Sequence, residues 1–246
     1  TIEMHLNKFL LFFFFLPGIY FAQYTAIPDQ NFEQALIDLG HDNVIDGQVL
    51  TANISSLTEL DVGGTYHNNR GITDLTGIEQ FTSLTELKCN HNQITSLDLS
   101  QNTNLVHLNC HYNQLNLLDV SQNINLEILT SGYNNLNSID ISSNSNLTSL
   151  VLDSNNLSSI DVTNNPQLVQ LSCDYNHQIN SLNVLNNPSL RMLNCSGLNL
   201  AALDLSNNLN LTNLLCENNQ LTNLDVSHLS SLYELRFSNN QVASIA

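Results

Sequence analysis

A cysteine, a histidine and an aspartate lie close together in the segment LNCHYNQLNLLDV, residues 108–120. Cys110 directly precedes His111, and Asp119 follows nine residues after the cysteine. These residue types can form a thiol nucleophile with its base and orienting acid, and they are also metal ligands. Either chemistry requires the three side chains to meet, so the elements that hold them decide what the segment does.

The chain repeats itself around this segment. Residues 84–104, LTELKCNHNQITSLDLSQNTN, align with residues 105–125, LVHLNCHYNQLNLLDVSQNIN, at a spacing of 21 residues. The first unit is irregular, with a longer loop over residues 65–70, and one step is lengthened by His177. The units start at Leu57, Leu84, Leu105, Leu126, Leu147, Leu168, Leu190, Leu211 and Leu232. The alternation in LxxLxC indicates a half-buried strand. Stacked units would bury one continuous core, which predicts a solenoid with a parallel sheet of one strand per repeat.

The unit LxxLxCxxNxLxxLDLSxNxx resembles the leucine-rich repeat family. The resemblance covers residues 57–246, about nine repeats with the last one incomplete, and implies a curved sheet with a concave face. The repeats are too short for a strand and a full helix, so we expect an irregular or 3₁₀-like convex side. In residues 27–40, IPDQNFEQALIDLG, the Pro–Asp start and the final glycine predict a short helix, and residues 51–56 predict another helical turn. Residues 23–56 thus resemble the helical N-terminal cap of internalin-like bacterial proteins.

The first 22 residues predict a signal peptide. A short basic region precedes an apolar stretch that ends at Phe21, and Ala22 offers a small residue at the cleavage site. The stretch is too short and broken to span a bilayer, so we expect no membrane span in the mature chain. Residues before Met4 are expected to be extraneous, and the gene product is expected to continue past Ala246. The resemblance extends to exported proteins of the Bacteroidetes group, in which a C-terminal sorting domain often follows the repeats. We therefore expect a secreted or cell-surface bacterial protein.

Charge narrows the classes of partner. Lys and Arg number 5 and Asp and Glu number 22, which gives a net charge of −17. Nucleic acid and anionic membranes bind clustered basic residues. We therefore predict no nucleic-acid partner.

All five cysteines fall on the inward sixth position of the repeat: Cys89, Cys110, Cys173, Cys195 and Cys216. A free cysteine behaves as a small apolar residue, so a buried thiol ladder is predicted, with a disulfide or metal site as the alternative. Neighbouring residues on a strand face opposite ways. Cys110 therefore points inward and His111 outward, while Asp119 lies on the return segment, so no catalytic triad is expected.

Asparagine and aspartate each recur at one position. The asparagines, which are expected to satisfy backbone groups where each strand turns, are Asn92, Asn113, Asn134, Asn155, Asn176, Asn219 and Asn240. Leu198 interrupts this column and predicts a local irregularity. The aspartates, which are expected to form Asx turns, are Asp98, Asp119, Asp140, Asp161, Asp204 and Asp225. Weak calcium binding is the alternative, both there and at Asp42 and Asp46 in HDNVIDGQVLTAN, which we interpret as a capping turn.

The outward positions of the repeat vary in residue type, whereas the leucine and asparagine positions of the repeat unit are nearly constant. The resemblance implies a non-catalytic adhesion or binding module that recognises a protein or a glycan on the concave face, without cofactor or structural metal. The alternatives are a solvated face without function and a structural spacer that displays a C-terminal domain. The candidate ligand-binding residues are His91, His107, His111, Tyr112, Tyr133, Asp153, Asp174, Tyr175 and Glu217. Alanine at Tyr112 and Tyr133 is expected to weaken ligand capture without lowering the melting temperature, and His91 and His111 could meet across strands.

Overall fold

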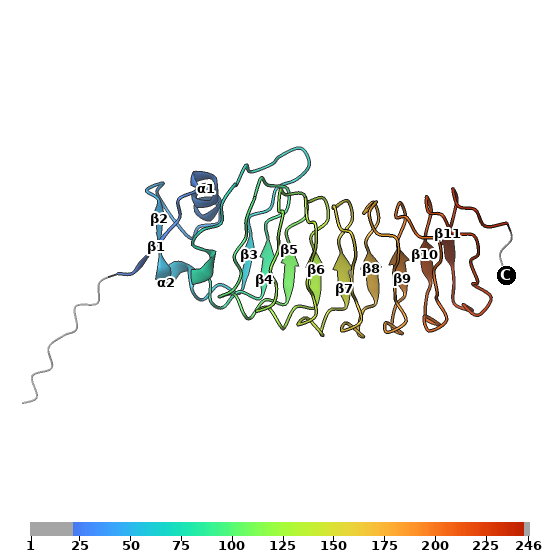
Figure 1. Ribbon diagram of the computed structural model, residues 1–246. Coiled ribbons are helices and arrows are strands. Elements are labelled where there is room, and N and C mark those ends of the chain that lie inside the picture. The colour runs from blue at the N-terminus through green and yellow to red at the C-terminus, as the bar shows by residue number, and fades with distance from the viewer. Residues whose placement is uncertain (1–21, 244–246) are drawn as a thin grey trace, which may run out of the picture.

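The computed structural model describes residues 22–243 and arranges them as one elongated stack of turns (Figure 1). A small N-terminal unit lies at one end, and the strand-bearing turns follow it in sequence order. The signal peptide predicted over residues 1–22 lies, apart from Ala22, outside the described residues.

Helix α1, Gln30–Asp38, lies within the segment for which a helix was predicted. Asp29 is its N-cap, and one carboxylate oxygen accepts hydrogen bonds from the backbone N–H groups of Asn31 and Phe32 at 2.9 and 3.0 Å. These bonds satisfy two donors that the first turn of a helix leaves unpaired. The other oxygen accepts a hydrogen bond from the backbone N–H of Thr73 at 2.8 Å. One carboxylate therefore starts the helix and ties it to the first repeat.

The remaining elements of the N-terminal unit cover the end of the stack. Helix α2, Thr51–Ile54, lies where a helical turn was predicted. Strands β1, Tyr24–Ala26, and β2, Gln48–Leu50, form an antiparallel pair that the sequence did not predict, because three residues are too few to show an alternating pattern. Phe32 of α1 stacks on Phe81 with 6.3 Å between the ring centroids. The unit thus continues the apolar core of the repeats.

One strand per turn forms the parallel sheet, and within residues 22–243 it has nine strands in sequence order. They are β3 (Glu59–Asp61), β4 (Glu86–Lys88), β5 (His107–Asn109), β6 (Ile128–Thr130), β7 (Ser149–Val151), β8 (Gln170–Ser172), β9 (Met192–Asn194), β10 (Asn213–Leu215) and β11 (Glu234–Arg236). Leu87 pairs with Leu108, and every later pair joins equivalent positions. The predicted parallel solenoid is confirmed. In the described part of the chain, the return segments form turns, with one 3₁₀ helix, η1, at Ile78–Gln80.

The five cysteines point into the core, and each is buried with a free thiol. Burial raises the pKa of the Cys110 thiol to about 11 and that of Cys173 to about 12. The thiolate is the form that attacks disulfides and binds metals. These thiols therefore remain protonated near neutral pH and pack as small apolar groups, as the predicted thiol ladder requires.

The asparagines at the ninth position, which we call the inner asparagine column, are hydrogen bonded as predicted. Asn134 is an example: its Oδ1 accepts from the backbone N–H of Leu115, one turn earlier, at 3.0 Å. Its Nδ2 donates to the carbonyl oxygens of Cys110 and Ser131 at 3.0 and 3.2 Å. One side chain therefore satisfies backbone groups of its own turn and of the turn before it.

Leu198 interrupts this column, and the preceding turn has a compensating change. The backbone N–H of Ile179, which in a regular turn would bond to the next asparagine, donates instead to the carbonyl oxygen of Asn176 at 3.0 Å. The inserted residue, His177, places its Nδ1 2.7 Å from the carbonyl oxygen of Gly197. The predicted irregularity is present, and the insertion and the missing asparagine are parts of one local arrangement.

Candidate functional site

Cys110, His111 and Asp119 do not form a reactive site. Cys110 is buried in the core, whereas Asp119 lies on the exposed return segment and accepts a hydrogen bond from the backbone N–H of Ser121 at 2.9 Å. Each of the aspartates in this column accepts such a bond from the residue two positions later, and the pKa of each carboxyl is lowered because hydrogen bonds from the hydroxyl and backbone N–H of that residue favour the ionised form: Asp98, Asp119, Asp140, Asp161, Asp204 and Asp225. The predicted Asx turns are confirmed.

Four of the predicted ligand-binding residues come together at one margin of the sheet. His91 stacks on Tyr112 with 4.4 Å between ring centroids, and Tyr112 stacks on Tyr133 with 4.2 Å. His111 meets Tyr112 and Tyr133 edge-on at 4.5 and 5.1 Å. Aromatic rings prefer these offset-stacked and edge-to-face arrangements. We call His91, Tyr112 and Tyr133 the aromatic stack.

The aromatic stack lies just beyond the strands, at one edge of the predicted concave face. Its three residues have φ angles of 51–53°, in the left-handed region, and belong to the turn that follows each strand. Strand β5 ends at Asn109, so the alternation of inward and outward residues stops before Tyr112. The rings therefore form a ridge at the edge of the sheet.

The left-handed turn gives a test of backbone strain at Ser154, which occupies the same position with a φ of 52°. Glycine adopts this region freely, whereas other residues pay about 1–2 kcal/mol, and glycine costs about 0.5–1 kcal/mol of chain entropy on folding. Ser154→Gly is therefore expected to raise the free energy of unfolding by about 0.5–1 kcal/mol in urea denaturation. Ser149→Gly, in strand β7 of the same repeat, is the matched control and should be destabilising. Equal effects of both changes would contradict the strain.

The next predicted residues, Asp153 and Asp174, lie beside this margin on neighbouring turns. Burial raises the pKa of both carboxyls, and the charge of Asp153 raises that of Asp174 further. Asp174 accepts a hydrogen bond from the Ser172 hydroxyl at 3.0 Å, whereas Oδ1 of Asp153 is buried without a hydrogen-bond partner. No Lys or Arg among residues 22–243 forms an ion pair with either carboxylate.

The other predicted residues lie apart from the aromatic stack. The ring of Tyr175 lies over Gly197, where an added Cβ would come within 2.9 Å of it. His107 is on strand β5, with Nδ1 3.9 Å from a carboxylate oxygen of Glu86. Glu217 lies two turns beyond Asp174 and accepts a hydrogen bond from the Ser238 hydroxyl. The predicted set is therefore a row along the stack and not one pocket.

The first repeat has a long loop at residues 65–70, for which the sequence predicted no role. The loop closes through a bridge between Thr65 and Asn68 and leaves Tyr66 largely exposed. Thr65, Tyr66 and Asn69 line an open hollow together with the aromatic stack. An insertion that carries a tyrosine into an otherwise constant repeat was the signal for this contribution.

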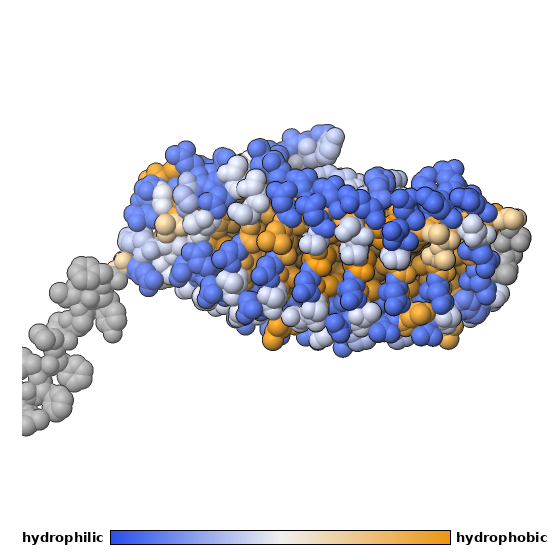
Figure 2. All heavy atoms as spheres, viewed as in Figure 1, coloured by the Kyte–Doolittle hydropathy of each residue, from blue (hydrophilic) through white to orange (hydrophobic). Residues whose placement is uncertain are grey.

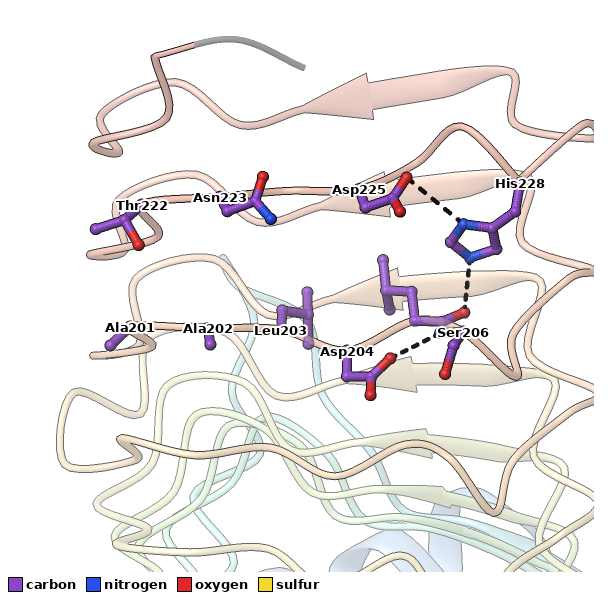
Figure 3. Close-up of a pocket in the computed structure, with 10 residues that line it drawn as sticks. Ala201, Ala202, Leu203, Asp204, Ser206, Thr222, Asn223, Asp225 and His228 are labelled. Carbon is purple, nitrogen blue, oxygen red and sulfur yellow. Dashed lines mark hydrogen bonds and ion pairs between the residues drawn. The ribbon is translucent and has the colours of Figure 1, made fainter. Parts of the chain in front are cut away.

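A second hollow, on the return segments, also gathers residues of catalytic types (Figure 3). Nε2 of His228 lies 3.1 Å from the carbonyl oxygen of Leu205, and Nδ1 lies 3.8 Å from Asp225. Ser206 donates its backbone N–H to Asp204. Because Nε2 of His228 is hydrogen bonded to the carbonyl oxygen of Leu205, the imidazole links two turns. It is not positioned to act as a base for Ser206.

The segment HDNVIDGQVLTAN, residues 41–53, is hydrogen bonded to Glu33 of α1, whose side chain is fully buried. Its Oε1 accepts hydrogen bonds from the backbone N–H groups of Asp46, Gly47 and Gln48 at 2.9, 2.7 and 3.1 Å. This arrangement agrees with the capping turn. Over the described residues 22–243, no three or more His, Cys, Asp or Glu side chains are grouped to hold a metal.

Comparison with known proteins identifies the repeat. The structure of the functional domain of InlJ from Listeria monocytogenes, described as including a cysteine ladder, superimposes with a TM-score of 0.85 at 37% identity, over 92% of this chain and 50% of that chain. The chain has the leucine-rich repeat fold. Curated internalin J of L. monocytogenes serotype 4b (strain F2365) is 40% identical over 75 residues, which are 30% of this leucine-rich repeat protein and 8% of internalin J. No family model matches the sequence.

Two further structures share the fold of this leucine-rich repeat protein. LIC12759 of Leptospira interrogans has a TM-score of 0.62 and 25% identity over 79% of this chain and 58% of that chain. The ectodomain of the receptor kinase GASSHO1/SCHENGEN3 from Arabidopsis thaliana, solved in complex with CASPARIAN STRIP INTEGRITY FACTOR 2, has a TM-score of 0.67 and 22% identity over 78% of this chain and 25% of that chain. None of the helices within residues 22–243 has the length and apolar character needed to cross a bilayer.

Proposed function

We propose that this leucine-rich repeat protein is a non-catalytic module that binds a partner protein on its sheet face. The observation that carries the proposal is the distribution of charge along that face. Lys88 pairs with Glu86 at 2.6 Å on β4, and Arg236 pairs with Glu234 at 2.6 Å on β11. These two ion pairs lie toward opposite ends of the sheet.

Between the two ion pairs, the outward residues of six strands include no Asp, Glu, Lys or Arg. They are His107, Asn109, Ile128, Thr130, Ser149, Val151, Gln170, Ser172, Met192, Asn194, Asn213 and Leu215. Figure 2 shows an apolar band that runs along the length of the stack between two polar margins. Centres of protein interfaces are depleted in charged residues. In a chain with a net charge of −17, a neutral face of this length favours contact with a protein.

Likeness to other repeat proteins supports the same function. The GASSHO1 ectodomain is known in complex with CASPARIAN STRIP INTEGRITY FACTOR 2, so this fold binds a partner in that protein. The pattern of residues 1–22 supports secretion or display at the cell surface, where an adhesion role would place the module. A glycan in place of a protein, or a spacer without a ligand, is an outcome of the test below.

Site-directed photocrosslinking tests the face that binds. A photoreactive phenylalanine analogue replaces Ser149 on β7 or, as the matched control, the exposed Ser159 on the return segment. Irradiation in a cell-surface protein extract is expected to give a discrete adduct from position 149 that excess unlabelled chain suppresses, and little from position 159. An adduct only from position 159 would place binding on the other side. No adduct from either position would favour the spacer, and a carbohydrate adduct would favour the glycan.

A further inference from the structure

We propose that the gap in the row of aromatic residues at Ser154, between Tyr133 and Tyr175, receives an arginine side chain of the partner protein. The inference rests on the proposed protein-binding function and names the chemistry by which the partner is recognised. Three observations support it: the width of the gap, the free ring faces on its two sides, and the unpaired carboxylates beside it.

The width follows from the register of the turns. Tyr133, Ser154 and Tyr175 hold the same position in successive turns, which are joined by hydrogen bonds from Tyr133 N–H to the Asp153 carbonyl at 2.7 Å and from Ser154 N–H to the Asp174 carbonyl at 2.8 Å. Neighbouring strands lie about 4.8 Å apart, so Tyr133 and Tyr175 are separated by about 10 Å. Two rings with one planar group between them need about 7–8 Å, because contacting carbons lie about 3.5–4.0 Å apart. The gap therefore admits one planar group stacked on one of the two rings and leaves about 2 Å to the other.

The rings on the two sides of the gap are available. Tyr133 is the last member of the aromatic stack, and its exposed fraction is 41%. Tyr175 is 46% exposed, and among the described residues its ring contacts one other ring, that of His177, edge-on at 6.0 Å. The serine hydroxymethyl at position 154 is too small to bridge them. Among the described residues, no aromatic ring contacts Tyr133 or Tyr175 from the turn of Ser154.

The charge beside the gap selects a cation. Asp153 and Asp174 directly precede Ser154 and Tyr175, within residues 22–243 neither forms an ion pair with a Lys or Arg, and Oδ1 of Asp153 has no hydrogen-bond partner there. The nearby His111 adds no positive charge near neutral pH, because burial and the neighbouring His91 lower its pKa. A bound cation would offset the burial that raises the pKa of both carboxyls and the charge of Asp153 that raises the pKa of Asp174 further.

Arginine matches the shape and the charge together. Its guanidinium is planar, stacks on aromatic faces and donates two parallel hydrogen bonds to a carboxylate. Lysine offers a point charge without a flat surface, and a phosphate would be repelled by both carboxylates. A neutral aromatic or sugar ring would use the tyrosines but leave the carboxylates unpaired.

Peptide titration tests the proposal directly. The probe is the blocked pentapeptide Gly-Ser-Arg-Ser-Gly, and the comparison peptide has citrulline, a neutral analogue of the same shape, in place of arginine. Binding is followed by NMR through the ring resonances of Tyr133 and Tyr175 in the ¹³C-tyrosine-labelled protein. The arginine peptide is expected to bind about tenfold more tightly than the citrulline peptide. Equal binding of the two peptides would overturn the selection of charge.

Variants of the protein separate the gap from the net charge. Ser154→Tyr fills the gap with the residue that three other turns carry at this position with a similar φ, so the fold is expected to persist and binding to fall about tenfold while both carboxylates remain. Asp153→Asn with Asp174→Asn should give a similar loss. Asp140→Asn with Asp161→Asn, which changes the net charge by the same amount on the return segments, should change affinity less than about twofold. Binding by Ser154→Tyr at the wild-type level would overturn the proposal.

The two proposals can fail separately. Crosslinking from position 149 in wild type, together with equal binding of the arginine and citrulline peptides, would leave the sheet face as the binding surface and remove the arginine site. Peptide binding at the gap, without crosslinking from position 149, would remove the sheet face and confine recognition to the margin.

Discussion

Replacement of Asn134 by leucine is expected to lower the free energy of unfolding by about 3 kcal/mol or more. The side chain is buried, accepts a hydrogen bond from the Leu115 N–H, and donates to the carbonyls of Cys110, Ser131 and Gly132. Leucine would fill the volume but leave one backbone donor and several acceptors without partners. Each buried polar group left unsatisfied costs about 1–3 kcal/mol.

Leu198 shows what makes leucine acceptable at this position. There the Ile179 N–H donates to the Asn176 carbonyl, and His177 has been inserted beside it. The turn before Asn134 has no such insertion, so Leu115 has no alternative acceptor of this kind. The same residue type is therefore tolerated at position 198 and expected to be costly at position 134.

The control for Asn134→Leu is Asn125→Leu. Asn125 is exposed and donates one hydrogen bond to the Thr103 carbonyl at 3.1 Å. Water can replace that bond, so the expected loss is below about 1 kcal/mol. Urea denaturation of both variants, followed by circular dichroism, gives the comparison. Similar losses would show that burial of the inner asparagine column is not what stabilises the turns.

Replacement of Glu33 by alanine is expected to destabilise the N-terminal unit by about 3 kcal/mol or more. One buried carboxylate oxygen accepts three backbone hydrogen bonds from Asp46, Gly47 and Gln48. Hydrogen bonds to a charged acceptor contribute about 1.5–3 kcal/mol each, and their loss would leave three donors without partners. Because these residues lead into strand β2, its pairing with β1 should loosen at the same time.

Hydrogen exchange measures this loss where it occurs, because stability in a repeat protein is local and not shared by the whole chain. In Glu33→Ala the amides of Asp46, Gly47 and Gln48 should lose protection, while those of β7 and β8 stay close to wild type. Glu33→Gln, which keeps one carbonyl oxygen, should fall between the two. The control is Gln34→Ala, which removes an exposed hydrogen bond to Asp38 from the same helix. Unchanged protection at Asp46, Gly47 and Gln48 in Glu33→Ala would contradict the role of the carboxylate.

The parallel sheet could be predicted from the sequence because one frame recurs with a period of 21 residues. Each leucine of that frame has an equivalent one turn away, so the period determines the register as well as the strand. Leu87 and Leu108 are paired for this reason. The same logic placed the cysteines in the core, since all five share one position of the frame.

The site was predicted less completely. The residues of the aromatic stack were selected by type and position, but their contact depends on a left-handed turn at Tyr112 and its equivalents. Bulky residues rarely adopt that conformation, so the period of the repeat could not predict the contact between the rings. Strands β1 and β2 were missed because they pair with each other outside the repeat.

The sequence did not predict that a second column of asparagines is buried and hydrogen bonded. Its members are fully buried, and each Nδ2 donates to carbonyl oxygens of the preceding turn: Asn102, Asn123, Asn144, Asn165, Asn187 and Asn208. The residue is visible in the repeat unit, but asparagine is mostly exposed in proteins. Only the packed return segments reveal that these amides are inside.

The asparagines of both columns reach toward the N-terminal end of the stack. Asn113 bonds to Ile94 and Cys89, and Asn123 bonds to Leu99, all in the turn before. A newly added turn therefore brings the groups that complete its predecessor, and the predecessor needs nothing from later in the chain except that one turn. During synthesis, when the N-terminal residues emerge first, each turn can dock on a finished edge and be secured by the next. The hydrogen bonding gives assembly a direction, as growth at one end of a polymer does.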